Sequence, residues 1–327
     1  MNSNKVYITS AGIITGTKSE ANQINYKIAS EQYEPMLEHF QTRNVDRMSK
    51  LSLAAATVTL ANRGVIIEKG SINDYGIILG TQFSALESIH NYDMEALEKG
   101  ALAVNPGLFP NTVLNSPSCQ VSIQFSFAGP VYTVCNGLTS SLDSIGIGYN
   151  LGKTNLSSMV LAGGVDEITE LQTMMKNSDK ALGEAAGFVM LESEKTITEN
   201  EKIAEIIGYK SRSLNQEWRL SLGELVSGLI LDAITSRGND IDNITNISLC
   251  SAFSCRENEV FLSDIIKEMN YSGAAECLEV NWMGACGIVQ VDEALKGIKK
   301  ENRENTIWAL VNVDKDKAVV VVLKAYK

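Results

Sequence analysis

The sequence predicts an α/β protein in which two duplicated halves form one five-layered αβαβα core, with two sheets between three layers of helices. Two observations predict this fold class. Short strand patterns alternate with amphipathic helix patterns along the chain of 327 residues. The same order of elements also occurs twice, on either side of a short polar segment at Lys195–Glu201. The expected halves are residues 1–198 and 199–327.

Each half is expected to begin with a strand, a helix and a second β-rich run. In both helices apolar residues return every three or four positions, and a glycine ends the pattern. The expected ranges are Lys5–Ile14, Lys50–Gly64 and Tyr75–Ser84 in the first half, and Lys202–Ser211, Gly223–Gly238 and Ile244–Ser254 in the second.

Each half then continues with a strand-to-helix passage and two closing strands. Continuous runs of Val, Ile and Leu in the closing strands are typical of strands that helices cover on both faces. The passages are Gly129–Gly152 and Cys277–Lys300, and the closing strands are Ser158–Asp166, Ala185–Ser193, Ile307–Val313 and Lys317–Tyr326.

The charge of the chain excludes two classes of partner. The sequence has 39 acidic and 28 basic residues, for a net charge of −11. Nucleic acids and anionic membranes attract basic patches, so we expect neither as a partner. The amino terminus lacks the pattern of a secretory signal, and the longest apolar run, Ala318–Leu323, is too short to span a bilayer. The sequence therefore predicts a cytoplasmic protein.

The six cysteines predict buried free thiols rather than a metal centre. They occur singly among apolar residues, without a CxxC pair or a nearby histidine. No cofactor is expected, because Gly146, Gly148 and Gly152 do not match GxGxxG and fall within a predicted helix, where close packing explains them. Two acid pairs are interpreted as ordinary loop or turn residues: Asp166 with Glu167, and Asp314 with Asp316.

Three segments resemble the β-ketoacyl-acyl carrier protein synthases, or ketosynthases. The corresponding family motifs read "PN…N…A…VSI.FG..GP", "VM.AGG.E" and "GEGAG.LVLE….A..RG..I.AEI.GY". The segments are Asn105–Pro130, Ser158–Glu167 and Gly183–Tyr209, and the stretch RMSKLSLAAATVTLANRG extends the similarity over nearly the whole chain. The resemblance implies the thiolase-like fold of this family.

The family's catalysis implies a cysteine nucleophile at the amino end of a buried helix, where the helix dipole stabilises the thiolate. An ungapped match of "GP…TACSSGL.AIG" to Gly129–Gly146 places this position on Leu138, which has no acidic proton. A gapped match would place it on Cys135, in the strand or elbow before the helix. We favour Leu138, with Cys135 as a buried structural thiol, and keep Cys135 as the alternative nucleophile.

The family also uses two histidines from its second half. The only histidines here, His39 and His90, lie in the first half, in segments expected to be surface or loop. The motif "AHGT.T..ND" corresponds to CSAFSCRENE and places Ser251 at the first histidine; "K…GH..GA.G" corresponds to VNWMGACG and places Asn281 at the second. The lysine of that motif has become Glu276 or a neighbour, and the hairpin VNVDKDKA stands where "GFGG.N" is expected.

A fold that is kept while its chemistry is lost implies a binding or structural role. Within the family this resembles the chain-length factor, a non-condensing subunit that forms a heterodimer with an active ketosynthase in type II polyketide systems. The resemblance implies that the chain shapes an acyl or polyene pocket, as in aryl polyene or fatty-acid-like biosynthesis, with Leu138, Trp282 and Met283 filling the degenerate site. Asn105–Pro130 and Val131–Val134 would lie at the subunit interface. Acyl carrier protein would bind indirectly, through the partner.

Two alternatives stay open. The chain could be a divergent condensing or acyl-transfer enzyme that uses Cys135 as its nucleophile. It could also be a homodimeric relic of the fold that binds an acyl chain or another protein.

Overall fold

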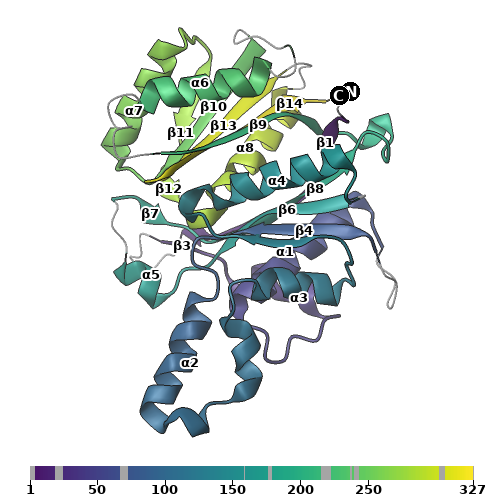
Figure 1. The fold of residues 1–327 in the computed structure, drawn as a ribbon, viewed down its shortest axis with the longest axis vertical. Coiled ribbons are helices and arrows are strands. Elements are labelled where there is room, and N and C mark those ends of the chain that lie inside the picture. Colours follow the sequence, from purple (N-terminus) through teal and green to yellow (C-terminus); the bar gives the residue numbers. More distant parts are fainter. Residues whose placement is uncertain are drawn as a thin grey trace.

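The structure is a computed structural model, which describes residues 4–18, 25–66, 73–157, 159–175, 179–214, 222–235, 238, 243–301 and 306–326. Within these ranges ten strands form one large sheet in the order β11-β10-β13-β14-β9-β1-β8-β6-β4-β5. Figure 1 shows that the strands make two layers with helices between them. The two layers are continuous because β1 and β9 pair antiparallel through Tyr7 and Ile8.

The two halves of the sheet follow the same path. If the five strands of each half are numbered along the chain, their order across the sheet is 3-2-4-5-1 in both halves. The first three strands of this path are parallel, and the last two pairings are antiparallel. The first half contains β1 (Val6–Thr15), β4 (Tyr75–Gly80), β5 (Val131–Val134), β6 (Met159–Asp166) and β8 (Ala185–Ser193). The second contains β9 (Ala204–Ser213), β10 (Ile244–Ser251), β11 (Ala274–Cys277), β13 (Ile307–Val313) and β14 (Lys317–Ala325).

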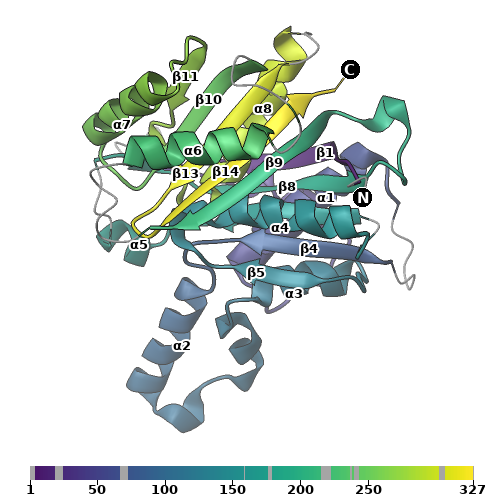
Figure 2. The same cartoon turned by 45° about the horizontal axis from the view of Figure 1, so that its top comes forward.

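Helices cover both outer faces and fill the space between the strand layers, which confirms the expected five layers (Figures 1 and 2). The outer helices of the first half are α1 (Arg47–Arg63) and α3 (Ser116–Gln124), and those of the second half are α6 (Leu222–Thr235) and α7 (Cys255–Glu268). The central helices are α4 (Ser140–Thr154) and α8 (Cys286–Glu301). Among the described helices, none combines the length and the apolar character needed to cross a membrane.

An arm projects from the body below this core (Figures 1 and 2). It contains α2 (Leu86–Lys99) and two 3-10 helices, Ala101–Ala103 and Pro106–Thr112, and no residue of α2 is buried. The remaining elements are α5 (Glu170–Met174) and two small strand pairs, β2 (Thr17–Lys18) with β3 (Tyr26–Lys27) and β7 (Ala181–Leu182) with β12 (Val280–Asn281).

The structure moves some expected boundaries by a few residues. Helix α1 begins before Lys50 because the Asp46 carboxylate accepts the Ser49 N–H at 2.7 Å and caps the helix there. Strand β4 ends at Gly80, so the rest of the run to Ser84 is a turn. The division at 198/199 precedes the 3-10 helix Glu199–Glu201 and stays a prediction. Three residues of the expected elements lie outside the described ranges: Ser158, Ser236 and Arg237.

The glycines of α4 allow the central helix to pack closely, as expected. A Cβ atom at Gly146 would lie 2.2 Å from the ring of Tyr209 on β9, and one at Gly148 would lie 2.8 Å from a methyl carbon of Leu191 on β8. Gly152 packs against Val6 of β1. These contacts pack α4 against strands of both halves.

We predict that Gly146→Ala destabilises the protein by about 1–3 kcal/mol, because the added methyl group overpacks the contact with Tyr209. Gly228 of α6 is a matched control, since a Cβ atom at this position would meet no described atom within 4 Å beyond its chain neighbours and the backbone of its own helix. Gly228→Ala should stabilise the protein by about 0.5–1 kcal/mol through helix propensity. Urea denaturation measures both changes, and stabilisation by Gly146→Ala would contradict the packing described.

Buried charges connect α1 to the ends of β6 and β8. The Arg47 guanidinium donates to Glu184 at 2.8 and 3.0 Å and to Glu167 at 3.1 Å. Glu184 also accepts the backbone N–H groups of Ile28 and Ile168. Burial raises the pKa of Glu167 from 4.5 to about 7, although the attraction of Arg47 opposes this shift. Glu167 is therefore an interior group whose charge costs free energy, rather than the ordinary loop residue expected.

The raised pKa of Glu167 predicts a pH-dependent stability. The folded state binds this proton more tightly than the unfolded state, so the stabilisation is complete below pH 4.5 and is lost as the pH rises to about 7. The stability of the wild type relative to Glu167→Gln should therefore fall by an amount on the order of 2 kcal/mol across this window. Glu98→Gln, an exposed change on α2, serves as the control. Parallel pH profiles for the wild type and Glu167→Gln would contradict this assignment.

Candidate functional site

The site that the family resemblance indicated lies at the amino end of α4. Strand β5 ends at Val134, a short loop follows, and the 3-10 helix Gly137–Thr139 leads directly into α4. Leu138 lies in this 3-10 helix, with 3% of its surface exposed, and it is part of the main hydrophobic core. The position that was expected to be degenerate therefore carries a buried leucine where a helix begins.

The backbone of Leu138 is held by the β13–β14 hairpin of the second half. Its N–H donates to the Asp314 carboxylate at 2.7 Å, and its carbonyl accepts from the Asn312 side chain at 3.3 Å. Asn312 is fully buried on β13. The hairpin turn expected from VNVDKDKA is present, since the Asp314 N–H donates to the carbonyl of Lys317 at 2.8 Å. The N–H and the carbonyl of Leu138 are thus both hydrogen-bonded to side chains of the same chain.

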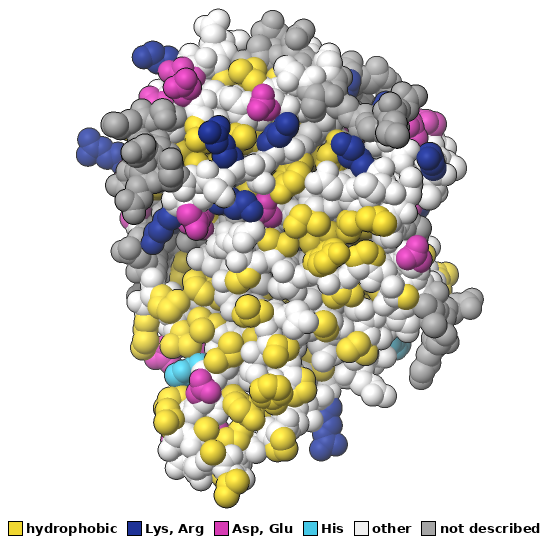
Figure 3. All heavy atoms as spheres, in the orientation of Figure 1, with side chains coloured by type: hydrophobic (Ala, Val, Ile, Leu, Met, Phe, Trp, Pro, Cys, Tyr) yellow, Lys and Arg dark blue, Asp and Glu magenta, His cyan; other side chains and the backbone are white. Residues whose placement is uncertain are grey.

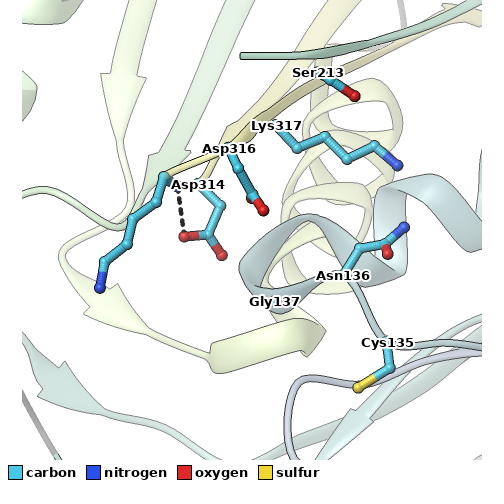
Figure 4. Close-up of a pocket in the computed structure, with 8 residues that line it drawn as sticks. Cys135, Asn136, Gly137, Ser213, Asp314, Asp316 and Lys317 are labelled. Atoms are coloured by element: carbon cyan, nitrogen blue, oxygen red, sulfur yellow. Dashed lines mark hydrogen bonds between the residues drawn. The ribbon is translucent and has the colours of Figure 1, made fainter. Parts of the chain in front are cut away.

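A polar pocket of about 510 Å³ lies beside the amino end of α4 (Figure 4). The turn between β13 and β14 forms one wall, and the loop before α4 forms the other. Figure 4 shows Asp314 and Asp316 on the turn and Cys135, Asn136 and Gly137 on the facing loop. The lining residues are Cys135, Asn136, Gly137, Ser213, Asp314, Lys315, Asp316 and Lys317.

Cys135 is exposed in this pocket, so the expectation of a buried structural thiol was wrong. The residue follows the last residue of β5, and its side chain lies on the loop rather than in the sheet. Its thiol donates to the carbonyl of Gln82 at 3.4 Å. Partial burial, with a smaller contribution from the negative charge of Asp166, raises the pKa of the Cys135 thiol. An activated nucleophile needs the opposite shift.

The other cysteines also differ in exposure. Cys250 and Cys286 are buried as expected, and Cys119 and Cys277 are partly buried, but Cys255 is exposed at the start of α7. The uniform expectation of buried thiols failed because Cys135 lies on the loop after β5 and Cys255 is the exposed first residue of α7. In the part of the chain that the structure describes, no group of three or more His, Cys, Asp or Glu side chains is arranged to hold a metal ion.

Asp166 organises the loops behind the pocket and is not an ordinary turn residue. It is fully buried at the end of β6 and accepts the Thr81 hydroxyl at 2.7 Å and the N–H groups of Gln82 and Phe83 at 2.8 and 3.2 Å. The Gly284 N–H also contributes a hydrogen bond. Burial raises the pKa of Asp166 from 3.8 to about 6, and the hydrogen bonds oppose that shift. One carboxylate therefore joins the turn after β4 to the segment before α8.

A second buried carboxylate, Asp143, supports the front of the pocket from α4. It accepts from Asn136 at 2.9 Å, from the Tyr209 hydroxyl at 3.0 Å and from the Lys317 ammonium at 2.5 Å. Burial and the neighbouring Asp143 charge raise the pKa of Tyr209 to about 12, which keeps its hydroxyl protonated as a donor. The sequence reasoning missed Asp143, Asn312 and Lys317. The run of charges in VNVDKDKA contains Lys317 but not Asp143.

The residues at the two histidine positions make structural contacts. The Ser251 hydroxyl at the end of β10 bonds the buried Asn258 side chain, and the Ser251 carbonyl accepts from Lys180 at 3.2 Å. The Asn281 side chain accepts the Met283 N–H at 2.9 Å. Glu276 is exposed on β11. These contacts show how the positions are used in the fold, while their correspondence to family histidines stays a prediction.

The apolar residues expected in the degenerate site are buried. Trp282 packs on Gly183, where a Cβ atom would lie 2.3 Å from the indole ring, and it also contacts Tyr26. Met283 is 1% exposed and belongs to a small apolar cluster with Ile168 and Leu182. Their burial is what a filled site requires, and their role as pocket residues stays a prediction.

The two histidines lie away from these groups in the described structure. His39 is exposed in a turn and His90 is partly exposed on α2, which agrees with the expected surface or loop positions. Neither is among the residues that line the pocket beside α4. The described residues of this pocket therefore include no imidazole that could act as a general base or as an electrophile.

Comparison with solved structures supports the same architecture over the full chain. The chain is similar to the ishigamide ketosynthase/chain length factor, with a TM-score of 0.79, 16% identity and coverage of 99% of this chain and 100% of the other. It is also similar to a chain of a type II polyketide synthase acyl-carrier protein in complex with its ketosynthase, with a TM-score of 0.80, 15% identity and coverage of 98% and 99%. A beta-ketoacyl synthase from Burkholderia phymatum matches with a TM-score of 0.80, 14% identity and coverage of 99% and 100%.

Curated relatives match by sequence over shorter regions. A 3-oxoacyl-[acyl-carrier-protein] synthase 2 of Coxiella burnetii is 26% identical over 61% of this chain and 55% of its own length. Nodulation protein E of a Rhizobium species is 26% identical over 51% of this chain and 47% of its own length. The granaticin polyketide putative beta-ketoacyl synthase 1 of Streptomyces violaceoruber is 23% identical over 45% and 35%. The chain thus spans about half of the length of the curated relatives that it matches, or less.

The family model described as the beta-ketoacyl synthase N-terminal domain matches residues 7–183. This region contains β1 from its second residue, the elements up to β7, Leu138 and all of α4, and the whole chain has the thiolase-like ketosynthase fold. The chain therefore belongs to the beta-ketoacyl synthase family.

Proposed function

We propose that this chain is a non-condensing ketosynthase-like subunit, which pairs with an active ketosynthase and shapes the space for its acyl or polyene product. The observation that carries the proposal is the buried Leu138 at the amino end of α4, in a sequence whose two histidines both lie in the first half. Leucine cannot form an acyl thioester, and no histidine of the second half is available to stabilise one.

The solved relatives support the kind of system. One of them is a ketosynthase/chain length factor, and another is a type II polyketide synthase ketosynthase with its acyl-carrier protein. We propose that the partner of this chain is likewise an active ketosynthase of a type II polyketide pathway, with aryl polyene or fatty-acid-like biosynthesis as the finer assignment. The net charge of −11 suits a subunit whose partner supplies the basic surface for an acidic carrier protein.

The structure offers a surface for such a partner on the first half. Strand β5 is the last strand of the sheet, so one of its edges faces no other described strand. Eight of the fourteen exposed large hydrophobic side chains that the structure describes lie between Met94 and Tyr132, on the arm, α3 and β5. Figure 3 shows hydrophobic side chains gathered over the lower half of one face and on the arm. An apolar surface of this kind next to an open sheet edge is typical of a protein interface.

The divergent-enzyme alternative has one observation in its favour, the exposure of Cys135 in the pocket. A covalent acyl or cerulenin adduct on Cys135, located by peptide mass spectrometry, would support that alternative. The raised pKa of the thiol argues against it, since the thiolate is the reactive form.

We predict that the chain co-purifies in a 1:1 complex when it is co-expressed with the active ketosynthase of its pathway. Ile123→Asp on α3 and Tyr132→Asp on β5 should each weaken the complex at least about tenfold, because a charge would be buried against an apolar partner surface. Val260→Asp on α7 is the control, because Val260 is similarly exposed but lies on the second half.

Native mass spectrometry and size-exclusion chromatography measure the pairing. A chain that is monodisperse alone and never co-purifies with a ketosynthase would contradict the proposal. Equal loss of binding for Val260→Asp would contradict the position of the interface.

A further inference from the structure

The contact between Asp314 and Leu138 affects a second requirement of acyl transfer, apart from the nucleophile: a vacant N–H donor. The Asp314 Oδ2 atom lies 2.7 Å from the Leu138 nitrogen, at the point where the 3-10 helix enters α4. Backbone N–H groups at a helix start carry partial positive charge and bind anions. An amide of this kind is also the donor that stabilises the negative oxygen formed in acyl transfer. Here the donor is occupied by a carboxylate of the same chain.

The carboxylate is held in place from its own turn. The Asp314 Oδ1 atom accepts the Lys315 N–H at 2.7 Å, so each oxygen has a backbone donor. The Asp314 N–H in turn donates to the Lys317 carbonyl at 2.8 Å, which closes the hairpin. The Lys317 ammonium is paired with Asp143 on α4, and this ion pair joins the turn to the helix a second time. The side chain is therefore oriented before any ligand enters the pocket.

The facing loop is shaped to receive the carboxylate. Gly137 has a φ of +62°, which favours glycine, and a Cβ atom at this position would lie 2.1 Å from Asp314 Oδ2. A side chain at position 137 would thus displace the carboxylate. Gly137 and Asp314 fit one another across the two halves of the fold, and their contact lies in the wall of the pocket of about 510 Å³.

We propose that the Asp314 carboxylate blocks this site: it occupies the N–H of Leu138, so the negatively charged oxygen of an acyl-transfer intermediate cannot bind there. A second anionic oxygen cannot share this donor, because the two negative charges would repel at hydrogen-bond distance. The inference rests on the proposed non-condensing role of this site. It adds that the site lacks both a nucleophile and a vacant N–H donor at Leu138, so that a new nucleophile alone would not restore acyl transfer.

The first test places a thiol at the site and measures its acidity. In Leu138→Cys, the carboxylate of Asp314 should keep the pKa of the introduced thiol high, and adding Asp314→Ala should raise its alkylation rate at pH 7 about tenfold or more. Iodoacetamide pH profiles read by peptide mass spectrometry separate this thiol from Cys135. Asp316→Ala is the matched control, because it removes an equal charge from the same turn and pocket. An unchanged pH profile of alkylation with Asp314→Ala, or an equal effect of Asp316→Ala, would overturn the proposal.

A second test needs no change in the core. Hydrogen exchange of the Leu138 amide should be at least tenfold faster in Asp314→Ala than in the wild type, and unchanged in Asp316→Ala. Asp314→Asn should keep most of the protection, since an amide oxygen still accepts the bond. Equal exchange in the wild type and Asp314→Ala would show that the carboxylate does not hold the amide, and would overturn the proposal. Pairing with a ketosynthase is measured separately, at the surface between Met94 and Tyr132, so either proposal can fail alone.

Discussion

The amino end of α4 is the junction on which the rest of the structure depends. Asp314 and Asn312 hold the backbone of Leu138 from the second half, and Asp143 extends the connection to Lys317 and to Tyr209. A hydrogen bond that a helix N–H donates to a carboxylate is among the stronger single contacts in a protein. The same contacts therefore connect the two strand layers and form one wall of the pocket.

The central helices also meet at this junction. The Ser141 hydroxyl of α4 accepts the Gly287 N–H of α8 at 2.8 Å, and a Cβ atom at Gly287 would lie 2.7 Å from the Leu142 nitrogen. These are equivalent helices of the two halves, since each follows the third strand of its half. A fold of this kind does not by itself imply a catalytic site.

The fold was largely predictable from the sequence because its signals are local and repeated. Buried strands such as Ile307–Val313 are continuous apolar runs, and helices such as α1 have a cap and a terminal glycine next to their own residues. The site was less predictable. Asp314 and Leu138 are separated by 176 residues, and nothing near either of them in the sequence indicates their contact. Asp166 is a similar case, because an acid at a strand end is exposed in most loops, and only the folded loops around it supply its donors.

Cys135 shows why a motif alignment alone could not assign the site. The alignment gave two positions for the family nucleophile. In the structure Leu138 lies at the helix start and has no thiol, whereas Cys135 has a thiol but lies before the helix start, in a pocket whose described lining includes no histidine. The helix-start position and the thiol group are thus found on two different residues. The absence of histidine from the second half, read from the whole sequence, is the firmer evidence for a non-condensing role.

The most direct test of that role is product formation by this chain reconstituted with the proposed partner ketosynthase and supplied with loaded acyl carrier protein. Cys135→Ser in this chain should leave the rate of product formation unchanged within about twofold, and replacement of the nucleophilic cysteine of the ketosynthase should abolish it. Loss of product with Cys135→Ser in an intact complex, or product formed by this chain without the ketosynthase, would contradict the account.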